Sequence, residues 1–298
     1  MPYLEWPEET VSGIDRFERW HEQGSNICLD FHGNPATAEL VVFSDGNHHM
    51  ALKDCLKYFK EQNRKLSDIF YATTPPGPIL KMIRTRGLQL GNLTLKVSPH
   101  IFISPPDILK SLLNEGFIQE YHPFVRNQGN VLLVKKGNPK NIQTVSDINQ
   151  DGIILFLSNP ETEKSSYKIY YNTLKALSGI TGFPDNLTES DRVIFGKRIH
   201  HREAPQSVAD GNADAAVVFY HLGLRYVRIF PDTFDIIPLG GSIEKPDPLP
   251  GNMTAETCIG LVQDGGIWAG KLLSFMKSEK AMEIYRSHGL LPWNSRGR

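Results

Sequence analysis

The sequence is poor in cysteine and carries almost no net charge. Its 298 residues include three cysteines, Cys28, Cys55 and Cys258, and the formal net charge at pH 7 is -1. Three scattered cysteines cannot build a disulfide framework, and an odd number leaves one thiol unpaired, which favours a reducing compartment. A nearly neutral chain has no overall field to attract nucleic acid. We therefore expect neither a disulfide scaffold nor a nucleic-acid-binding protein.

Long apolar runs and targeting segments are also lacking. No run approaches the roughly 18 apolar residues that a membrane helix needs. Residues 1–9 contain no basic stretch, apolar stretch or small-residue cleavage site of the kind found in signal peptides. We expect no membrane insertion and, for the chain as sequenced, a cytoplasmic protein, although a chain with its leader removed would read the same way.

Catalytic and metal-binding motifs are missing from the sequence. There is no Gly-x-Ser-x-Gly, no P-loop, no Gly-x-Gly-x-x-Gly, no Cys-x-x-Cys and no His-Glu-x-x-His. Asp45, Glu203 and Asp214 could each supply a carboxylate beside a histidine, but such pairs arise often by chance. We expect no catalytic residue, no metal and no cofactor, and hence no enzyme.

Apolar strand patterns alternate with helical patterns along most of the chain. The first unit is a β-branched strand at 39–43 that stops at Ser-Asp-Gly-Asn, followed by apolar residues at helical spacing over 50–59. Further strands are expected at 69–71, within 95–103, and at 130–135, 152–157, 193–199, 211–220, 234–239 and 258–262; further helices at 79–86, 108–115, 165–177, 203–210 and 266–287. This alternation predicts an α/β fold whose sheets are mostly parallel and flanked by helices.

Five segments, in one order, resemble the extracellular solute-binding proteins of ABC transporters, specifically the molybdate/tungstate-type oxyanion receptors. They are Leu40-Val-Val-Phe-Ser-Asp-Gly-Asn, Val97-Ser-Pro-His-Ile-Phe-Ile-Ser-Pro-Pro-Asp, the Val-Leu-Leu-Val-Lys-Lys-Gly-Asn-Pro stretch within 127–139, Val208-Ala-Asp-Gly-Asn-Ala-Asp-Ala-Ala-Val-Val-Phe, and the closing helix from Phe275. The matches span residues 38–292. Departures fall where that family contacts its ligand, which is typical of a separate branch whose ligand need not be molybdate.

The resemblance implies a two-lobed, periplasmic-binding-protein-like fold of type 2, with two crossover strands as the hinge. Lobe one would be residues 1–128 plus 238–298, and lobe two residues 129–237. Such a protein would be a periplasmic or extracellular monomer that closes on a small anion in the cleft between its lobes and hands it to an ABC permease. Two alternatives remain open: an intracellular sensor or carrier of the same fold, and a metal-dependent enzyme that uses a histidine-rich cleft.

Hydroxyl and amide side chains follow the predicted strands at the expected ligand contacts. The resemblance places Asn47, Thr73, Thr74, Ser165 and Ser166 at loops that pass from strand to helix. Backbone N–H groups and the positive end of a helix dipole bind anions there without a cation. The same residue types also cap helices, so each of these side chains could serve either role or both.

Histidine pairs are the unusual feature of these loops. His48-His49 follows the first strand, and His200-His201-Arg202 precedes a helix of the middle segment. Together with Tyr220, we expect His48, His49, His201 and Arg202 to line the ligand site. An arginine among imidazole donors suits a carboxylate or phosphate group, which it can bind bidentately. A transition metal held by two or three imidazoles is the alternative.

Overall fold

The computed structural model describes residues 30–73, 76–90, 93–197 and 200–293. The chain divides by its contacts into two compact units. The middle unit is Asn127–Ala255, and the flanking unit contains the described residues of 30–126 and 256–293. Each unit has its own sheet and its own apolar core, so the α/β class expected from the sequence is confirmed.

The flanking unit is built on a seven-stranded mixed sheet. Its order is β1 (Asp30–His32), β3 (Ile69–Thr73), β2 (Leu40–Ser44), β6 (Ile101–Ser104), β13 (Glu256–Val262), β7 (Ile118–Arg126) and β14 (Leu291–Pro292). β2 pairs in parallel with β3 and β6, and the other pairings are antiparallel. A separate hairpin joins β4 (Leu88–Leu90) to β5 (Leu93–Leu95).

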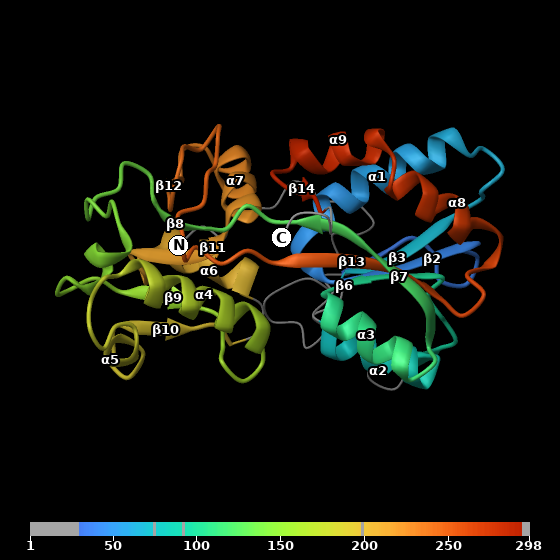
Figure 1. The fold of residues 1–298 in the computed structure, drawn as a ribbon, viewed down its shortest axis with the longest axis horizontal. Helices are drawn as coiled ribbons and strands as arrows, with labels where there is room; N and C mark the ends of the chain where they lie inside the picture. The colour runs from blue at the N-terminus through green and yellow to red at the C-terminus, as the bar shows by residue number, and fades with distance from the viewer. Residues whose placement is uncertain (1–29, 74–75, 91–92, 198–199, 294–298) are drawn as a thin grey trace. The chain divides into compact units, whose positions relative to one another are not determined.

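Helices cover both faces of this sheet (Figure 1). One face packs against α1 (His49–Gln62), α8 (Gly266–Met276) and α9 (Glu279–Ser287), which bury Leu52, Leu272 and Tyr285 among others. The opposite face packs against α2 (Pro76–Thr85) and α3 (Pro106–Asn114). Because successive strand residues point to opposite faces, the buried run of β2 supplies Leu40 and Val42 to one core and Val41 and Phe43 to the other.

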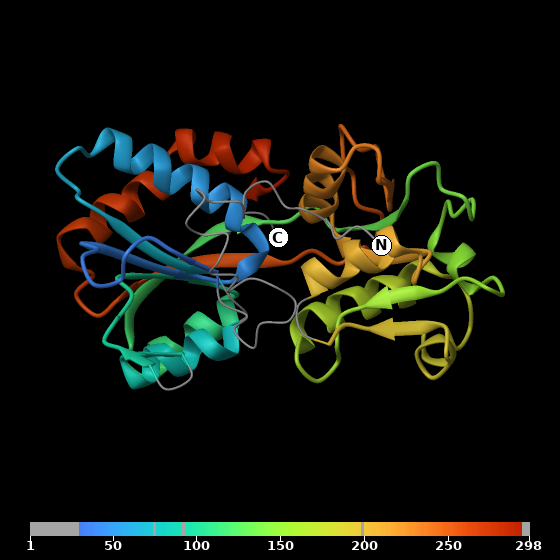
Figure 2. The ribbon, with the colours of Figure 1, turned by 180° about the vertical axis from the view of Figure 1, so that it is seen from behind.

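The middle unit has a five-stranded mixed sheet. Its order is β10 (Val193–Phe195), β9 (Leu155–Leu157), β11 (Ala215–Phe219), β8 (Asn130–Lys135) and β12 (Phe234–Pro238). β9 pairs in parallel with β10 and β11, whereas β8 runs antiparallel to β11 and β12. The helical segments, which can be followed from behind in Figure 2, are η2 (Val145–Asn149), α4 (Lys164–Leu177), α5 (Asp185–Thr188), α6 (His200–Asp210) and α7 (Tyr220–Ile229).

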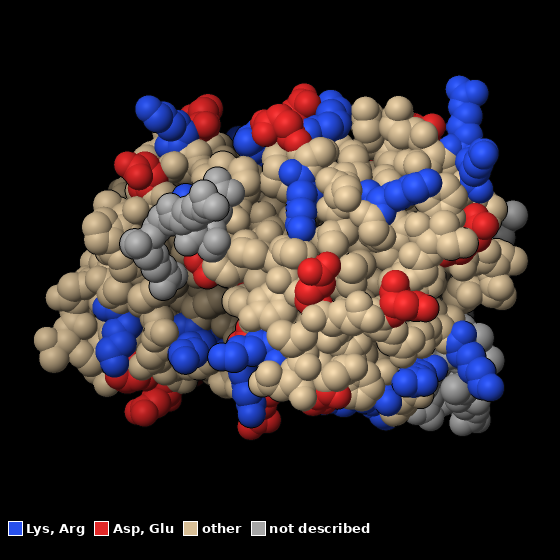
Figure 3. Space-filling model, turned by 45° about the vertical axis from the view of Figure 1, so that its right-hand side comes forward, with Lys and Arg blue, Asp and Glu red and all other residues tan. Residues whose placement is uncertain are grey.

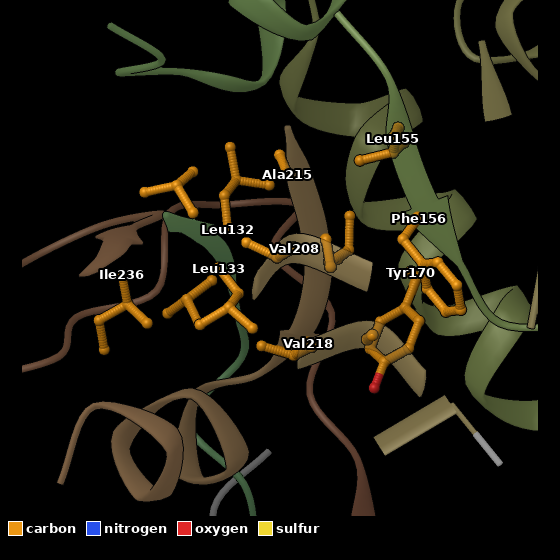
Figure 4. Close-up of a cluster of buried hydrophobic side chains, with 14 of the residues drawn as sticks. Leu132, Leu133, Leu155, Phe156, Tyr170, Val208, Ala215, Val218 and Ile236 are labelled. Atoms are coloured by element: carbon orange, nitrogen blue, oxygen red, sulfur yellow. The ribbon is translucent and has the colours of Figure 1, made fainter. Parts of the chain in front are cut away.

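The core of the middle unit is a continuous apolar cluster around β8, β9 and β11. Figure 4 shows Leu132, Leu133, Leu155 and Val218 among its members, with the aromatic rings of Phe156 and Tyr170 next to each other. Burial of a side chain of this size contributes about 1.5–3 kcal/mol to stability. The cluster therefore fixes the strands whose ends carry the candidate site.

Three expectations about the fold require correction. The expectation of mostly parallel sheets holds only for the pairs that β2 makes with β3 and β6 and that β9 makes with β10 and β11, whereas the other pairs in the two sheets are antiparallel. The single helix expected over 266–287 is two helices, α8 and α9. The chain breaks at Ser278, whose extended backbone and hydroxyl, which accepts the Ala281 N–H at 3.3 Å, start a new helix.

The segment 238–255 packs with the middle unit, whereas the sequence assigned it to the other lobe. The reason is a polar contact that the sequence does not reveal. The buried Asn252 side chain accepts the Asn130 N–H at 2.8 Å and donates to the carbonyl oxygens of Asn130 and Leu239, each at 3.0 Å. Thr173 accepts the Met253 N–H at 3.0 Å.

Parallel pairing decides where the loops of each unit lie. Since β2, β3 and β6 run in one direction, their carboxyl ends share one edge of the sheet, and α1, α2 and α3 begin there. The carboxyl ends of β9, β10 and β11 likewise share an edge of the middle sheet, from which α4, α6 and α7 begin. We call these the carboxyl edges of the two units.

Candidate ligand-binding edges

The turn from β2 to α1 forms the centre of the flanking unit's carboxyl edge. Asp45 has extended backbone and its carboxylate accepts the Asn47 N–H at 3.2 Å, which starts the short 3₁₀ turn η1 (Gly46–His48) before α1. Ser44, Asp45 and His48 are buried, whereas Asn47 and His49 are only partly so. Within this turn, the side chains of Asn47 and His49 therefore remain partly accessible to solvent.

The imidazole of His48 is held inside the unit. Its Nε2 lies 3.1 Å from the Ser44 Oγ, and its Nδ1 lies 3.0 Å from the phenol oxygen of Tyr285 on α9. Burial lowers the pKa of His48 to about 4 and raises the pKa of the neighbouring Asp45 to about 7. Tyr285 was not expected from the sequence, because its position in an apolar helical pattern indicates only a core residue.

Thr73 stands beside this turn. It ends β3 and is the register partner of Ser44 on the adjacent strand, so both hydroxyls lie at the same edge. Thr73 is buried, and Thr74 lies outside the described residues. Ser104 ends the third parallel strand and is also buried.

In the middle unit, α4 starts as the sequence indicated, with Ser165 exposed and Ser166 partly exposed in its first turn. No side chain caps this helix and no acidic residue lies in its first turn. The loop before it is fixed by Asn159, whose side-chain oxygen accepts the N–H groups of Glu161 and Thr162 at 2.8 and 3.2 Å. These contacts hold the start of α4 at the carboxyl edge.

The start of α6 differs from the sequence-based picture. The N–H of His200 donates to both carboxylate oxygens of Glu163, at 3.1 and 3.3 Å, and Glu203 accepts the N–H of Lys197 at 2.9 Å. Burial raises the pKa of Glu163 to about 7. A carboxylate of the protein itself thus occupies the helix start at which an external anion was expected.

Two arginines act on one histidine at this edge. Burial and the positive charges of Arg202 and Arg225 lower the pKa of His201 well below its usual range. Tyr226 of α7 donates its hydroxyl to the His201 carbonyl oxygen at 2.7 Å, which brings α7 against the start of α6. Arg202 is only 9% exposed, so its side chain is buried. Arg225 was missed because helical spacing alone does not indicate which helix it will contact.

Tyr220 begins α7 at the end of β11. Its N–H donates to the Gly129 carbonyl oxygen at 2.9 Å, and its hydroxyl donates to the Ile243 carbonyl oxygen at 2.7 Å. The next residue, His221, stacks on the Phe219 ring with the ring centres 5.6 Å apart. Tyr220 thus links the carboxyl edge to the segment that follows β12.

Charge and metal-binding potential are modest over the described parts of the chain. Figure 3 shows Lys and Arg interspersed with Asp and Glu on the face that it displays. No group of three or more His, Cys, Asp or Glu residues within the described ranges could hold a metal ion. None of the helices among those residues is long and apolar enough to cross a membrane.

Comparison with solved structures places the fold among binding proteins with different ligands. The chain is similar to a periplasmic molybdate-binding protein from Azotobacter vinelandii (16% identity, TM-score 0.62, covering 86% of this chain and 100% of that one). It is also similar to a tungstate-binding protein from Desulfovibrio alaskensis G20 (14%, 0.57, 86% and 99%) and to a ferric binding protein from Campylobacter jejuni (17%, 0.55, 87% and 88%). At these identities the likeness concerns the fold alone.

The sequence also matches a family model. Comparison with curated protein sequences gave no match. The model that describes bacterial extracellular solute-binding proteins matches residues 40–291, which is most of the chain. Members of that family bind solutes rather than transform them. The chain therefore belongs to the bacterial extracellular solute-binding protein family.

Proposed function

We propose that this protein is the binding component of an ABC-type uptake system and that its ligand is a small anion, either an oxyanion or a small carboxylate or phosphate. In this role it acts outside the cytoplasm and works with a membrane permease. The residues that we expect to contact the ligand lie at the carboxyl edges: Asn47, His49 and Thr73 in the flanking unit, and Ser165, Ser166, His201, Arg202 and Tyr220 in the middle unit.

The observation that carries the proposal is the character of the helix starts at these edges. α1 and α7, one in each unit, begin directly after a parallel strand or its short 3₁₀ turn. Neither has an acidic residue in its first turn or a side-chain capping bond. Such a start directs backbone N–H groups and the positive end of the helix dipole at whatever lies beyond it, which favours an anion.

Two features refine this picture. Arg202 and Arg225 add positive charge near the start of α6, which suits a ligand with carboxylate or phosphate oxygens. Glu163 and Asp45 work against anion binding, because the carboxylate of each already accepts a backbone N–H at the start of a helix. The pKa of each is raised by burial to about 7, so both carry less than a full negative charge near neutral pH.

A thermal-shift series tests the proposal directly. We expect at least one anion among molybdate, tungstate, sulfate, phosphate and small carboxylates to bind in the micromolar range or tighter. At 100 times its dissociation constant, a ligand stabilises the folded state by about 2.7 kcal/mol, which raises the melting temperature measurably. Chloride at the same ionic strength is the control. If no member of this panel moves the melting point, the anion proposal is wrong.

We expect the substitution Arg202→Gln to weaken anion binding about tenfold to 100-fold, the equivalent of about 1.5–3 kcal/mol for a hydrogen bond to a charged group. Isothermal titration measures the affinity, and urea unfolding reports any separate loss of stability from this buried position. Arg64→Gln, at an exposed position after α1, is the control and should change neither. A variant that unfolds easily but binds with unchanged affinity would assign Arg202 a structural role.

A further inference from the structure

His48 lies at the centre of a chain of hydrogen bonds that joins β2 to α9. We call this chain, from Tyr285 through His48 to Ser44, the relay. Tyr285, His48 and Ser44 are at most 4% exposed, and Asp45 is equally buried. The phenol of Tyr285 meets the His48 Nδ1 at 3.0 Å, and the His48 Nε2 meets the Ser44 Oγ at 3.1 Å. Tyr285 lies 237 positions from His48 in the sequence, so only the packing of α9 against α1 brings the two together.

The direction of each bond follows from the donors available. The Ser44 hydroxyl donates its proton to the Asp45 carbonyl oxygen at 3.0 Å, so its oxygen can only accept from His48. The His48 Nε2 is therefore the protonated nitrogen. In a neutral imidazole the Nδ1 is then an acceptor, and it receives the O–H of Tyr285. Burial supports these states, because it keeps the imidazole neutral and raises the pKa of Tyr285 well above its usual range.

We propose that Tyr285 is a positioning residue that, through His48 and Ser44, fixes the β2–α1 turn in its anion-binding conformation. This inference rests on the proposed function, since it concerns the same edge. Ser44 and His48 are buried, whereas Asn47 and His49 of the same turn are partly exposed, and the His49 Nδ1 lies 2.9 Å from the Gly46 carbonyl oxygen. The relay thus holds the buried positions of the turn and thereby fixes the backbone that carries Asn47 and His49.

Packing around the relay leaves it little alternative geometry. The Tyr285 ring meets Phe124 of β7 edge-on with ring centres 4.8 Å apart, and it tilts against the His48 ring at 5.7 Å. The Asp45 N–H donates to the Ile103 carbonyl oxygen of β6 at 3.0 Å. The titratable groups that face the relay are Asp45, 3.6 Å from the His48 Nε2, and Cys55 of α1 near the phenol.

The substitution Tyr285→Phe removes one oxygen and retains the ring packing. We expect it to weaken the binding of molybdate, sulfate or inorganic phosphate, whichever the unmodified protein binds, about threefold to tenfold by isothermal titration, in line with one buried hydrogen bond. Ser44→Ala breaks the other end of the relay and should weaken binding similarly. Because both act through His48, the double variant should lose much less than the sum of the two. Tyr58→Phe, on α1 in the same unit, is the control and should leave affinity unchanged.

A spectroscopic readout separates positioning from general stability. In the ligand-free protein, ¹⁵N chemical shifts of the His48 ring should show a protonated Nε2 and a bare Nδ1, and Tyr285→Phe should alter this pattern. A protonated Nδ1 in the unmodified protein, additive effects in the double variant, or unchanged affinity in Tyr285→Phe would each overturn the relay. If the unmodified protein binds no member of the anion panel of the thermal-shift series, the proposed function fails, and the ring signature alone then decides whether the relay exists.

Discussion

Replacing Asn252 with alanine is expected to lower the free energy of unfolding by about 3–4 kcal/mol. Its side chain serves the backbone N–H and C=O of Asn130 at the start of β8 and the carbonyl oxygen of Leu239. Truncation leaves these buried backbone groups without their partners, and each such group costs roughly 1–3 kcal/mol.

Urea unfolding followed by circular dichroism measures this loss, and hydrogen exchange at the Asn130 amide should accelerate in the variant. Asn212→Ala, at an exposed position of the same unit, is the matched control and should change stability by less than about 0.5 kcal/mol. A loss below 1 kcal/mol for Asn252→Ala would mean that water replaces the amide, and that the attachment of residues 238–255 to the middle unit depends on other contacts.

Removing the buried carboxylate of Asp45 is expected to change how stability depends on pH. The unfolded chain releases this proton near pH 4, whereas the folded protein keeps it to about pH 7. The folded state therefore binds more protons in this window, and stability falls as pH rises through it. Since one pKa unit is worth about 1.4 kcal/mol, Asp45→Asn should stabilise the protein at pH 8 by as much as about 4 kcal/mol.

Two buried histidines change the free energy of unfolding in the opposite direction over an overlapping pH range. Burial lowers the pKa of His48 and of His200 to about 4, so the unfolded chain binds the extra protons between about pH 4 and 6.5, and stability rises with pH there. Glu163, with a pKa raised to about 7, reinforces Asp45.

Unfolding free energies between pH 4 and 8 measure the balance. Asp45→Asn and Glu163→Gln should each make the slope of the unfolding free energy against pH more positive, and His48→Asn should make it less positive. Asp232→Asn, at an exposed position, is the control and should leave this slope unchanged. Equal slopes in Asp45→Asn and the unmodified protein would show that Asp45 is ionised in the fold.

Tertiary structure was needed wherever a site residue depends on a distant partner. Sequence spacing identified His48 but could not predict its burial, because the burial depends on Tyr285 arriving from α9. It identified His201 and Arg202 but not Glu163, which occupies the start of α6, nor Arg225, which lies on another helix. Side-chain hydrogen bonds between distant segments have no periodic signature, so no local pattern reveals them.

The sequence by itself determined the class of fold and the order of most of its elements. Apolar runs such as 40–43 and 131–134 are buried on both faces of a sheet. Because a strand that is covered on both faces consists of consecutive apolar residues, the composition of such a run indicates a buried strand. The polar turn Ser-Asp-Gly-Asn at 44–47 marks where a strand ends, so it also located the carboxyl edge of the flanking unit. Only the tertiary structure decided that residues 238–255 join the middle unit and that Ser278 divides the last helix. Both outcomes depend on side chains that hydrogen-bond to backbone groups, and their effect on the fold appears only when those backbone groups are in place.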